Sequence, residues 1–213
     1  MNDMRQFRQQ GLTLLELSVV LLVLMGLAGL LIPFLGGTTD FARCTTTQAS
    51  MVAIRDALLG SFEKPGYRED MNALPVDIRG LLLQNYCLED ATLLTQATCT
   101  GAGKTWITQA AFNPVTRRGW RGPYLLQPML DDGYLQGNAI ILQIPSVDGD
   151  GNDCVTINAA YGQNDCARLV SNGPDGNPDT TLADANGSAR KDDRILYLFI
   201  PDPNPSPACN ARS

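Results

Sequence analysis

Histidine is absent from the 213-residue chain, and positive charge is sparse, with 16 Lys and Arg against 22 Asp and Glu. Without histidine the chain lacks the usual general base near neutral pH and the commonest ligand of transition metals. No G-x-S-x-G nucleophile elbow occurs, and "GAGKT" at 101–105 lacks the spacing of a phosphate-binding loop. The basic stretch "TRRGWRG" is too short to indicate nucleic-acid binding. We therefore expect neither an enzyme nor a nucleic-acid partner.

Charge is also missing from a long apolar stretch near the N-terminus, because no residue from Leu17 to Leu35 is charged. As a helix with a rise of about 1.5 Å per residue, this stretch would extend about 28 Å, close to the thickness of a bilayer core. We expect a transmembrane helix over 12–37. The alternative is a cleaved secretory signal, which should have a shorter apolar core and a small-x-small cleavage site.

Two arginines, Arg5 and Arg8, precede this stretch. The positive-inside rule therefore predicts a cytoplasmic N-terminus and an exported domain over 38–213. We expect a single-pass protein of the inner membrane with a periplasmic C-terminal domain. All six cysteines lie in the exported domain, and an even number suits an oxidising compartment.

The six cysteines favour disulfides over a metal site, since the chain has no histidine and no C-x-x-C pair. Several pairings are open from the sequence alone. Cys87–Cys99 and Cys154–Cys166 would each close a short loop. That choice leaves Cys44–Cys209 to tie the C-terminal tail to the helical region near Cys44.

The residues before the apolar stretch form a motif, "RQFRQQGLTLLEL", in which a short basic leader (1–11) ends at Gly11 and is followed by Leu12 and Glu16. This motif resembles the N-terminal signal of type IV pilins and of the pseudopilins of type II secretion systems, although phenylalanine is usual in place of Leu12. The resemblance implies cleavage after Gly11 by prepilin peptidase and methylation of Leu12. It further implies assembly with other subunits into a pilus or pseudopilus, at the cell surface or in the secretion machine. The size and the cysteines favour a minor subunit.

Glu16 is a carboxylate placed within an apolar stretch, where an unpaired charge is strongly unfavourable. In the family that the motif resembles, this glutamate is thought to pair with the N-terminal amine of a neighbouring subunit. The resemblance thus implies a role for Glu16 in assembly. The alternative is a side chain that reaches the membrane interface. For the whole protein, the alternative function is a membrane-tethered periplasmic binding or adhesion domain that does not polymerise.

The remainder of the chain changes from helical to strand periodicity. We expect a helix over 38–62, a connecting region over 63–137, a sheet over 138–200 and a proline-rich tail over 201–213. The expected fold class is α+β with an antiparallel sheet. The resemblance implies a pilin-like arrangement, in which a long N-terminal helix with a membrane-spanning first half packs on that sheet.

An acidic loop, "LVSNGPDGNPDTTLADANGSARKDDRI" at 169–195, lies between two expected strands. It resembles the loop of pseudopilins in which aspartates at both ends and backbone carbonyls bind calcium, an ion that takes oxygen ligands. The matching positions are Asp175, Asp192 and Asp193, with Leu169 and Ser171 as carbonyl donors. The loop is longer than usual, and Arg194 follows its acidic pair. The resemblance makes calcium an expected cofactor. Because these two departures weaken the match, an acidic surface loop held by turns is the alternative.

Overall fold

In the computed structural model, the described residues are 14–125, 132–134, 140–145, 154, 156–158, 163–183, 190–203, 205–206 and 209; the side chains of 28–38, 156–158 and 163–164 are not among them. The chain divides into two compact units, Met1–Phe41 and Ala42–Ser213. The boundary expected between the apolar stretch and the exported domain, at 37–38, lies a few residues before this division.

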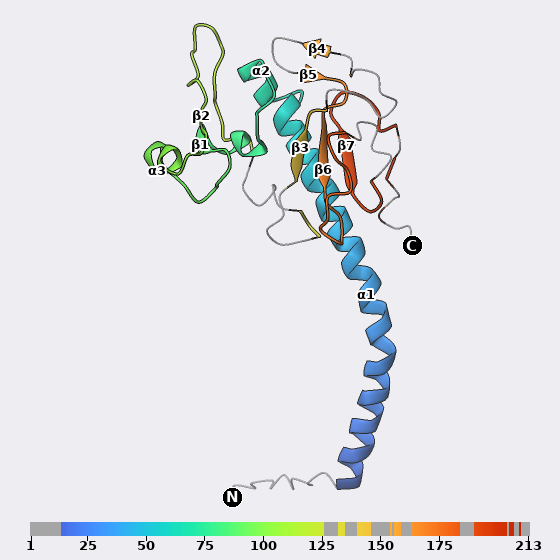
Figure 1. Ribbon diagram of the computed structural model, residues 1–213. Helices are drawn as coiled ribbons and strands as arrows, with labels where there is room; N and C mark the ends of the chain where they lie inside the picture. The colour runs from blue at the N-terminus through green and yellow to red at the C-terminus, as the bar shows by residue number, and fades with distance from the viewer. Residues whose placement is uncertain are drawn as a thin grey trace, which may run out of the picture. The chain divides into compact units, whose positions relative to one another are not determined.

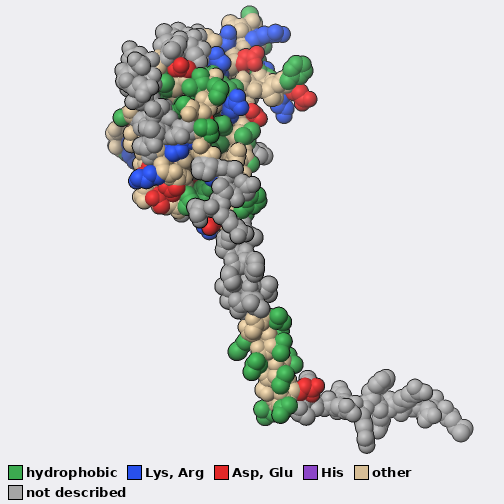
Figure 2. Space-filling view, turned by 90° about the vertical axis from the view of Figure 1, so that its right-hand side faces the viewer, with side chains coloured by type: hydrophobic (Ala, Val, Ile, Leu, Met, Phe, Trp, Pro, Cys, Tyr) green, Lys and Arg blue, Asp and Glu red, His purple; other side chains and the backbone are tan. Residues whose placement is uncertain are grey.

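Helix α1 spans Leu14–Leu59 (Figure 1). In the first unit every residue from 14 to 27 is exposed, and nearly all are apolar (Figure 2). In the second unit α1 buries one stripe of side chains at a spacing of three or four residues, which places them on one face of the helix. This stripe comprises Cys44, Thr47, Met51, Ile54 and Leu58.

The expected membrane-spanning helix is wrong for the part of the chain that the structure describes, where no helix is both long and apolar enough to cross a bilayer. The expected pilin-like fold class with its membrane-spanning half helix is corrected accordingly. The expected location, as a single-pass protein of the inner membrane, is corrected for the same reason.

The described β-structure of the second unit forms small antiparallel sheets, where we expected one sheet over 138–200. Strands β3 (Ile141–Gln143), β6 (Arg168–Ser171) and β7 (Arg194–Tyr197) form a three-stranded sheet in the order β3-β6-β7. Strand β4 (Thr156–Asn158) pairs with β5 (Gln163–Asn164). Strand β1 (Asn85–Cys87) pairs with β2 (Trp106–Thr108), within the expected connecting region.

Three short helical elements complete the described secondary structure: α2 (Tyr67–Met71), the 3-10 helix η1 (Ile78–Leu81) and α3 (Gln96–Gly101). Side-chain caps fix where two of them begin, because an oxygen of the preceding residue accepts an otherwise unpaired backbone N–H. The Asp77 carboxylate accepts from the Arg79 amide at 2.9 Å, and the Thr95 hydroxyl accepts from the Thr98 amide at 3.3 Å.

The core of the second unit lies between α1 and the three-stranded sheet, and in Figure 1 the cyan part of α1 passes behind β3 and β6. Ile54 and Leu58 of α1 and Leu169 of β6 are all fully buried. Burial of one such side chain stabilises the fold by about 1.5–3 kcal/mol. All four residues of the central strand β6 are buried, so this strand is covered on both faces.

Three disulfides stabilise the second unit, and they join the pairs expected from the sequence. Cys87–Cys99 connects β1 to α3, and Cys154–Cys166 closes a second local loop. Cys44–Cys209 links α1 to the C-terminal tail across 165 residues of sequence.

Candidate functional site

The acidic loop connects β6 to β7 and contains most of the site residues expected from the sequence. These two strands are antiparallel neighbours, with Ser171 opposite Arg194. The loop of residues 172–193 therefore connects the adjacent ends of β6 and β7. This topology explains why aspartates far apart in the sequence come together.

A close backbone approach joins the two ends of the loop at Gly173. Its φ is +65°, in the left-handed region, and a Cβ there would lie only 2.5 Å from the carbonyl oxygen of Asp192. Glycine is therefore required at this position. The Asp175 amide donates to the Asp192 carboxylate at 3.3 Å, and the Asn177 amide donates to the Asp175 carboxylate at 2.8 Å.

Three carboxylates converge in this loop: Asp175, Asp179 and Asp192 have oxygens within 4.8 Å of one another. Like charges this close repel each other, so a nearby cation or the protonation of a carboxylate would stabilise the cluster. Lys191 supplies one positive charge, because its Nζ lies 2.6 Å from Asp179 Oδ1. This hydrogen bond raises the pKa of Lys191, while the Asn177 amide lowers the pKa of Asp175.

Three buried side-chain oxygens of the same loop find no hydrogen-bond partner in the described part of the chain: Asn172 Oδ1, Asp179 Oδ2 and Asp193 Oδ1, of which Asp179 alone belongs to the three-carboxylate cluster. An unsatisfied buried acceptor costs about 1–3 kcal/mol. All three are hard oxygen donors of the kind that calcium prefers. The residues present thus fit a hard cation with oxygen ligands.

The structure changes the expected ligand set in one respect. Asp175 and Asp192 come together as expected, but the third member of the cluster is Asp179. Asp193 is only 1% exposed, and its Oδ2 accepts from the Thr180 amide at 2.6 Å. Burial raises the pKa of Asp193. The sequence signal for Asp179 was its place in the same loop, between Asp175 and the paired acids.

The two expected carbonyl donors, Leu169 and Ser171, both lie in β6. Leu169 is paired with Leu142 of β3 and with Leu196 of β7, and its side chain is in the core. The Ser171 hydroxyl donates to Asp132 Oδ2 and accepts from the Gly173 amide at 3.3 Å. Ser171 therefore supports the base of the loop through its side chain.

Asp132 connects this loop base to α1. It is 4% exposed, and its Oδ1 accepts from the Thr47 hydroxyl at 2.8 Å and from the Tyr134 amide at 3.0 Å. The Thr47 hydroxyl in turn accepts from the Gly133 amide at 3.0 Å. A single buried carboxylate thus joins α1 to β6 by hydrogen bonds within the second unit.

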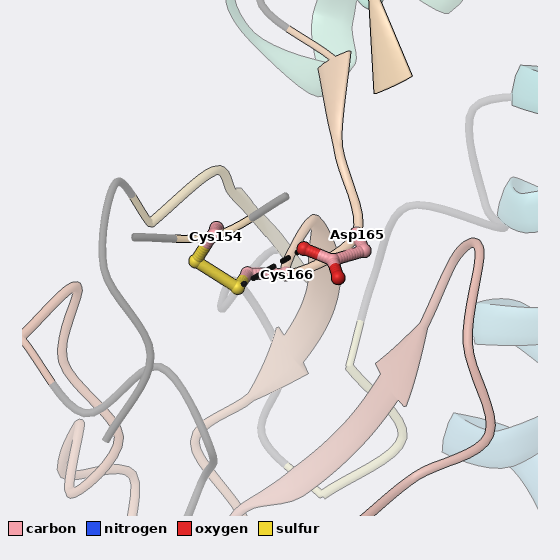
Figure 3. Close-up of side chains that lie close together, drawn as sticks. All are labelled: Cys154, Asp165 and Cys166. Atoms are coloured by element: carbon pink, nitrogen blue, oxygen red, sulfur yellow. Dashed lines mark hydrogen bonds between the residues drawn. A yellow bond between two sulfur atoms is a disulfide. The ribbon is translucent and has the colours of Figure 1, made fainter. Parts of the chain in front are cut away.

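A second group of potential metal-ligating side chains, Cys154, Asp165 and Cys166, is a structural cross-link (Figure 3). The two sulfur atoms are bonded to each other. Asp165 Oδ1 lies 3.6 Å from Cys166 Sγ, but a disulfide sulfur carries no proton and cannot donate to it. This group therefore has no thiolate to bind a metal.

The processing and assembly residues lie near the N-terminus. Gly11 and Leu12 are outside the described residues. Glu16 lies in the first turn of α1 on an exposed position, surrounded along the helix by exposed apolar side chains. Among these, Leu14 is 86% exposed and Met25 is 75% exposed.

Comparison with known proteins adds no relative to these observations. No family model, no curated protein and no solved structure matches the chain.

Proposed function

We propose that the chain is a structural subunit, cleaved after Gly11 by prepilin peptidase and assembled with other pilin or pseudopilin subunits into a type IV pilus or a type II secretion pseudopilus. Two features support this proposal. The first is the motif from Arg5 to Glu16, which resembles a prepilin signal. The second is the exposed apolar helix of residues 14–27, which carries the argument from the structure.

The helix of residues 14–27 exposes an unusual amount of apolar surface. Large apolar side chains point outward in every direction, from Val20 at 49% exposure to Leu14 at 86%. A helix that is apolar all round is normally buried, because each exposed methylene group costs about 0.8 kcal/mol relative to its burial. Copies of the same segment can supply the missing contacts, since leucine and valine side chains of neighbouring helices interdigitate well.

Glu16 gives such an assembly a fixed register. It is the single charged residue between residues 14 and 27. Cleavage after Gly11 would create a new amine at Leu12, and a carboxylate buried between apolar helices is tolerable only when it is paired. An amine of a neighbouring copy meets this requirement, and a misaligned copy does not. Polar residues in apolar helix contacts specify register in this way.

Calcium is the cofactor that we propose for the acidic loop, bound by Asp175, Asp179 and Asp192. The ion would offset the repulsion between the three carboxylates and would satisfy buried oxygens such as Asp179 Oδ2. Its role would be structural, because it would hold the two ends of the β6–β7 loop together beside the core of the second unit.

The assembly proposal is tested by comparing Glu16→Gln with Ser18→Ala in cells that express prepilin peptidase and the other subunits. Ser18 lies in α1 two residues after Glu16, and its hydroxyl donates a local hydrogen bond of 2.8 Å to the Leu15 carbonyl. We expect both variants at wild-type levels in whole cells. The Ser18 variant should enter the assembled fraction recovered by shearing, whereas the Glu16 variant should not. Normal amounts of the Glu16→Gln subunit in that fraction would contradict the proposal.

A further inference from the structure

On the basis of the calcium site proposed above, we infer that Lys191 is a built-in cation of the acidic cluster, which competes with the metal ion and thereby sets the calcium concentration at which the loop responds. Without a metal, the ammonium group of Lys191 would occupy part of the space that calcium takes. With calcium bound, it would swing into solvent.

The backbone places Lys191 for this role. It directly precedes Asp192, and its φ of 41° lies in the left-handed region, which non-glycine residues seldom adopt. This conformation accompanies the contact of its Nζ with Asp179 Oδ1 at 2.6 Å. The left-handed backbone and the ion pair occur together at the far end of the loop, where the chain turns towards β7.

The two partners of this ion pair differ in burial. The side chain of Asp179 is 12% exposed, whereas that of Lys191 is 76% exposed. The carboxylate is therefore fixed in the fold, and the lysine reaches it from solvent on a flexible stem. Only the lysine can leave without disturbing the packed structure.

Competition follows from the size of the groups. Calcium binds carboxylate oxygens at about 2.3–2.6 Å. An ammonium nitrogen already 2.6 Å from Asp179 Oδ1 would lie within a few ångströms of an ion bound to the same carboxylate. Two positive charges at such a distance repel each other strongly. Binding of calcium to Asp179 therefore requires that Lys191 moves away.

The ammonium group of Lys191 and a calcium ion both compensate the negative charge of the three carboxylates. The three carboxylates of the cluster carry three negative charges when ionised, and one ammonium offsets one of them. The loop thus has a weakly compensated arrangement without metal and a better compensated one with calcium. Lys191 lowers the affinity for calcium while it protects the metal-free loop from charge repulsion.

The test measures calcium binding to the full chain by calorimetric titration with calcium chloride, for wild type, Lys191→Gln and a matched control. Lys104→Gln is the control, because Lys104 forms a similar pair, 2.5 Å from Asp90 Oδ2, outside the acidic loop. We expect Lys191→Gln to bind calcium about tenfold more tightly, the effect of removing one positive charge near a divalent ion. Lys104→Gln should bind like wild type. In chelator, Lys191→Gln should melt at a lower temperature than wild type.

The possible results separate the two proposals. If wild type binds calcium and Lys191→Gln binds it equally or more weakly, the competing role of Lys191 is wrong and the calcium site stands. If neither protein binds calcium, the calcium site is wrong, and the role of Lys191 falls with it. In both cases the assembly proposal is judged separately, by the fate of the Glu16 variant in the sheared fraction.

Discussion

Replacement of Asp132 by alanine should destabilise the second unit more than any surface substitution. The Asp132 carboxylate accepts hydrogen bonds from the Thr47 hydroxyl, the Ser171 hydroxyl and the Tyr134 amide. Thr47 and Ser171 are both 0% exposed, so water cannot replace the lost acceptor without entering the core. Each donor left unsatisfied costs about 1–3 kcal/mol.

We therefore expect Asp132→Ala to lower the free energy of unfolding by about 3–5 kcal/mol. The hydroxyls of Thr47 and Ser171 still accept from the Gly133 and Gly173 amides, which keeps the loss below the sum of three complete penalties. A total of this size is a large part of the stability of a typical domain, about 5–15 kcal/mol. Asp132→Asn keeps the shape and one acceptor oxygen, so it should cost about 1 kcal/mol.

Urea unfolding of the disulfide-intact chain, followed by tryptophan fluorescence, measures these changes. Thr47→Val removes one donor from the network and should cost about 1–2 kcal/mol. Thr46→Val is its matched control, because the Thr46 hydroxyl is exposed and bonds only to the Ala42 carbonyl at 2.8 Å. That control should change stability by less than about 0.5 kcal/mol. A loss below about 1 kcal/mol for Asp132→Ala would refute the reasoning that this carboxylate is a buried junction between α1 and β6.

Three further predictions concern the loop and the disulfides. Calcium should raise the free energy of unfolding by about 1.4 kcal/mol for each tenfold excess over its dissociation constant, and the melting temperature should rise with it. Asp175→Ala should remove most of this rise. Equal melting temperatures in calcium and in chelator would contradict the prediction. Because burial raises the pKa of Asp193, the stability that its protonated form contributes is present below pH of about 4 and is lost as the pH rises through the raised pKa. Asp193→Asn should therefore melt higher than wild type in chelator at neutral pH, with a difference that vanishes in acid; a lower melting temperature at neutral pH would oppose this. Replacing Cys44 and Cys209 together by serine should cost about 2–5 kcal/mol, more than the same change at Cys87 and Cys99, because the cross-link spans 165 residues rather than 12; equal losses in urea unfolding would argue against this ranking.

Two of the disulfides could be predicted because each closes a short loop, whereas the acidic cluster was expected from the resemblance of its loop to a loop of pseudopilins. Cys87 and Cys99, and likewise Cys154 and Cys166, are 12 residues apart, and the two local pairs leave one remaining pair. In the acidic loop the sequence could not distinguish Asp192 from Asp193. Residues 190–193 form a turn, in which the Asp193 amide donates to the Arg190 carbonyl at 2.6 Å and Lys191 has a φ of 41°. Asp192 joins the cluster from this turn, while the Asp193 carboxylate accepts from the Thr180 amide.

The membrane-spanning helix and the single sheet were the main errors. The uncharged stretch from Leu17 to Leu35 indicated a span by its composition, whereas no helix in the described part of the chain is both long and apolar enough to cross a bilayer. The strand-like runs after residue 138 indicated β-structure without giving its pairing. Pairing depends on contacts between distant residues, such as Ile141 with Val170, which local periodicity does not contain.

The N-terminus of the mature protein tests the central claim most directly. Intact-mass and peptide mass spectrometry of the chain, purified from cells that contain prepilin peptidase, would identify its first residue and any modification. The account predicts a chain that begins with N-methylated Leu12. A chain that begins at Met1, or at any residue other than Leu12, would contradict it.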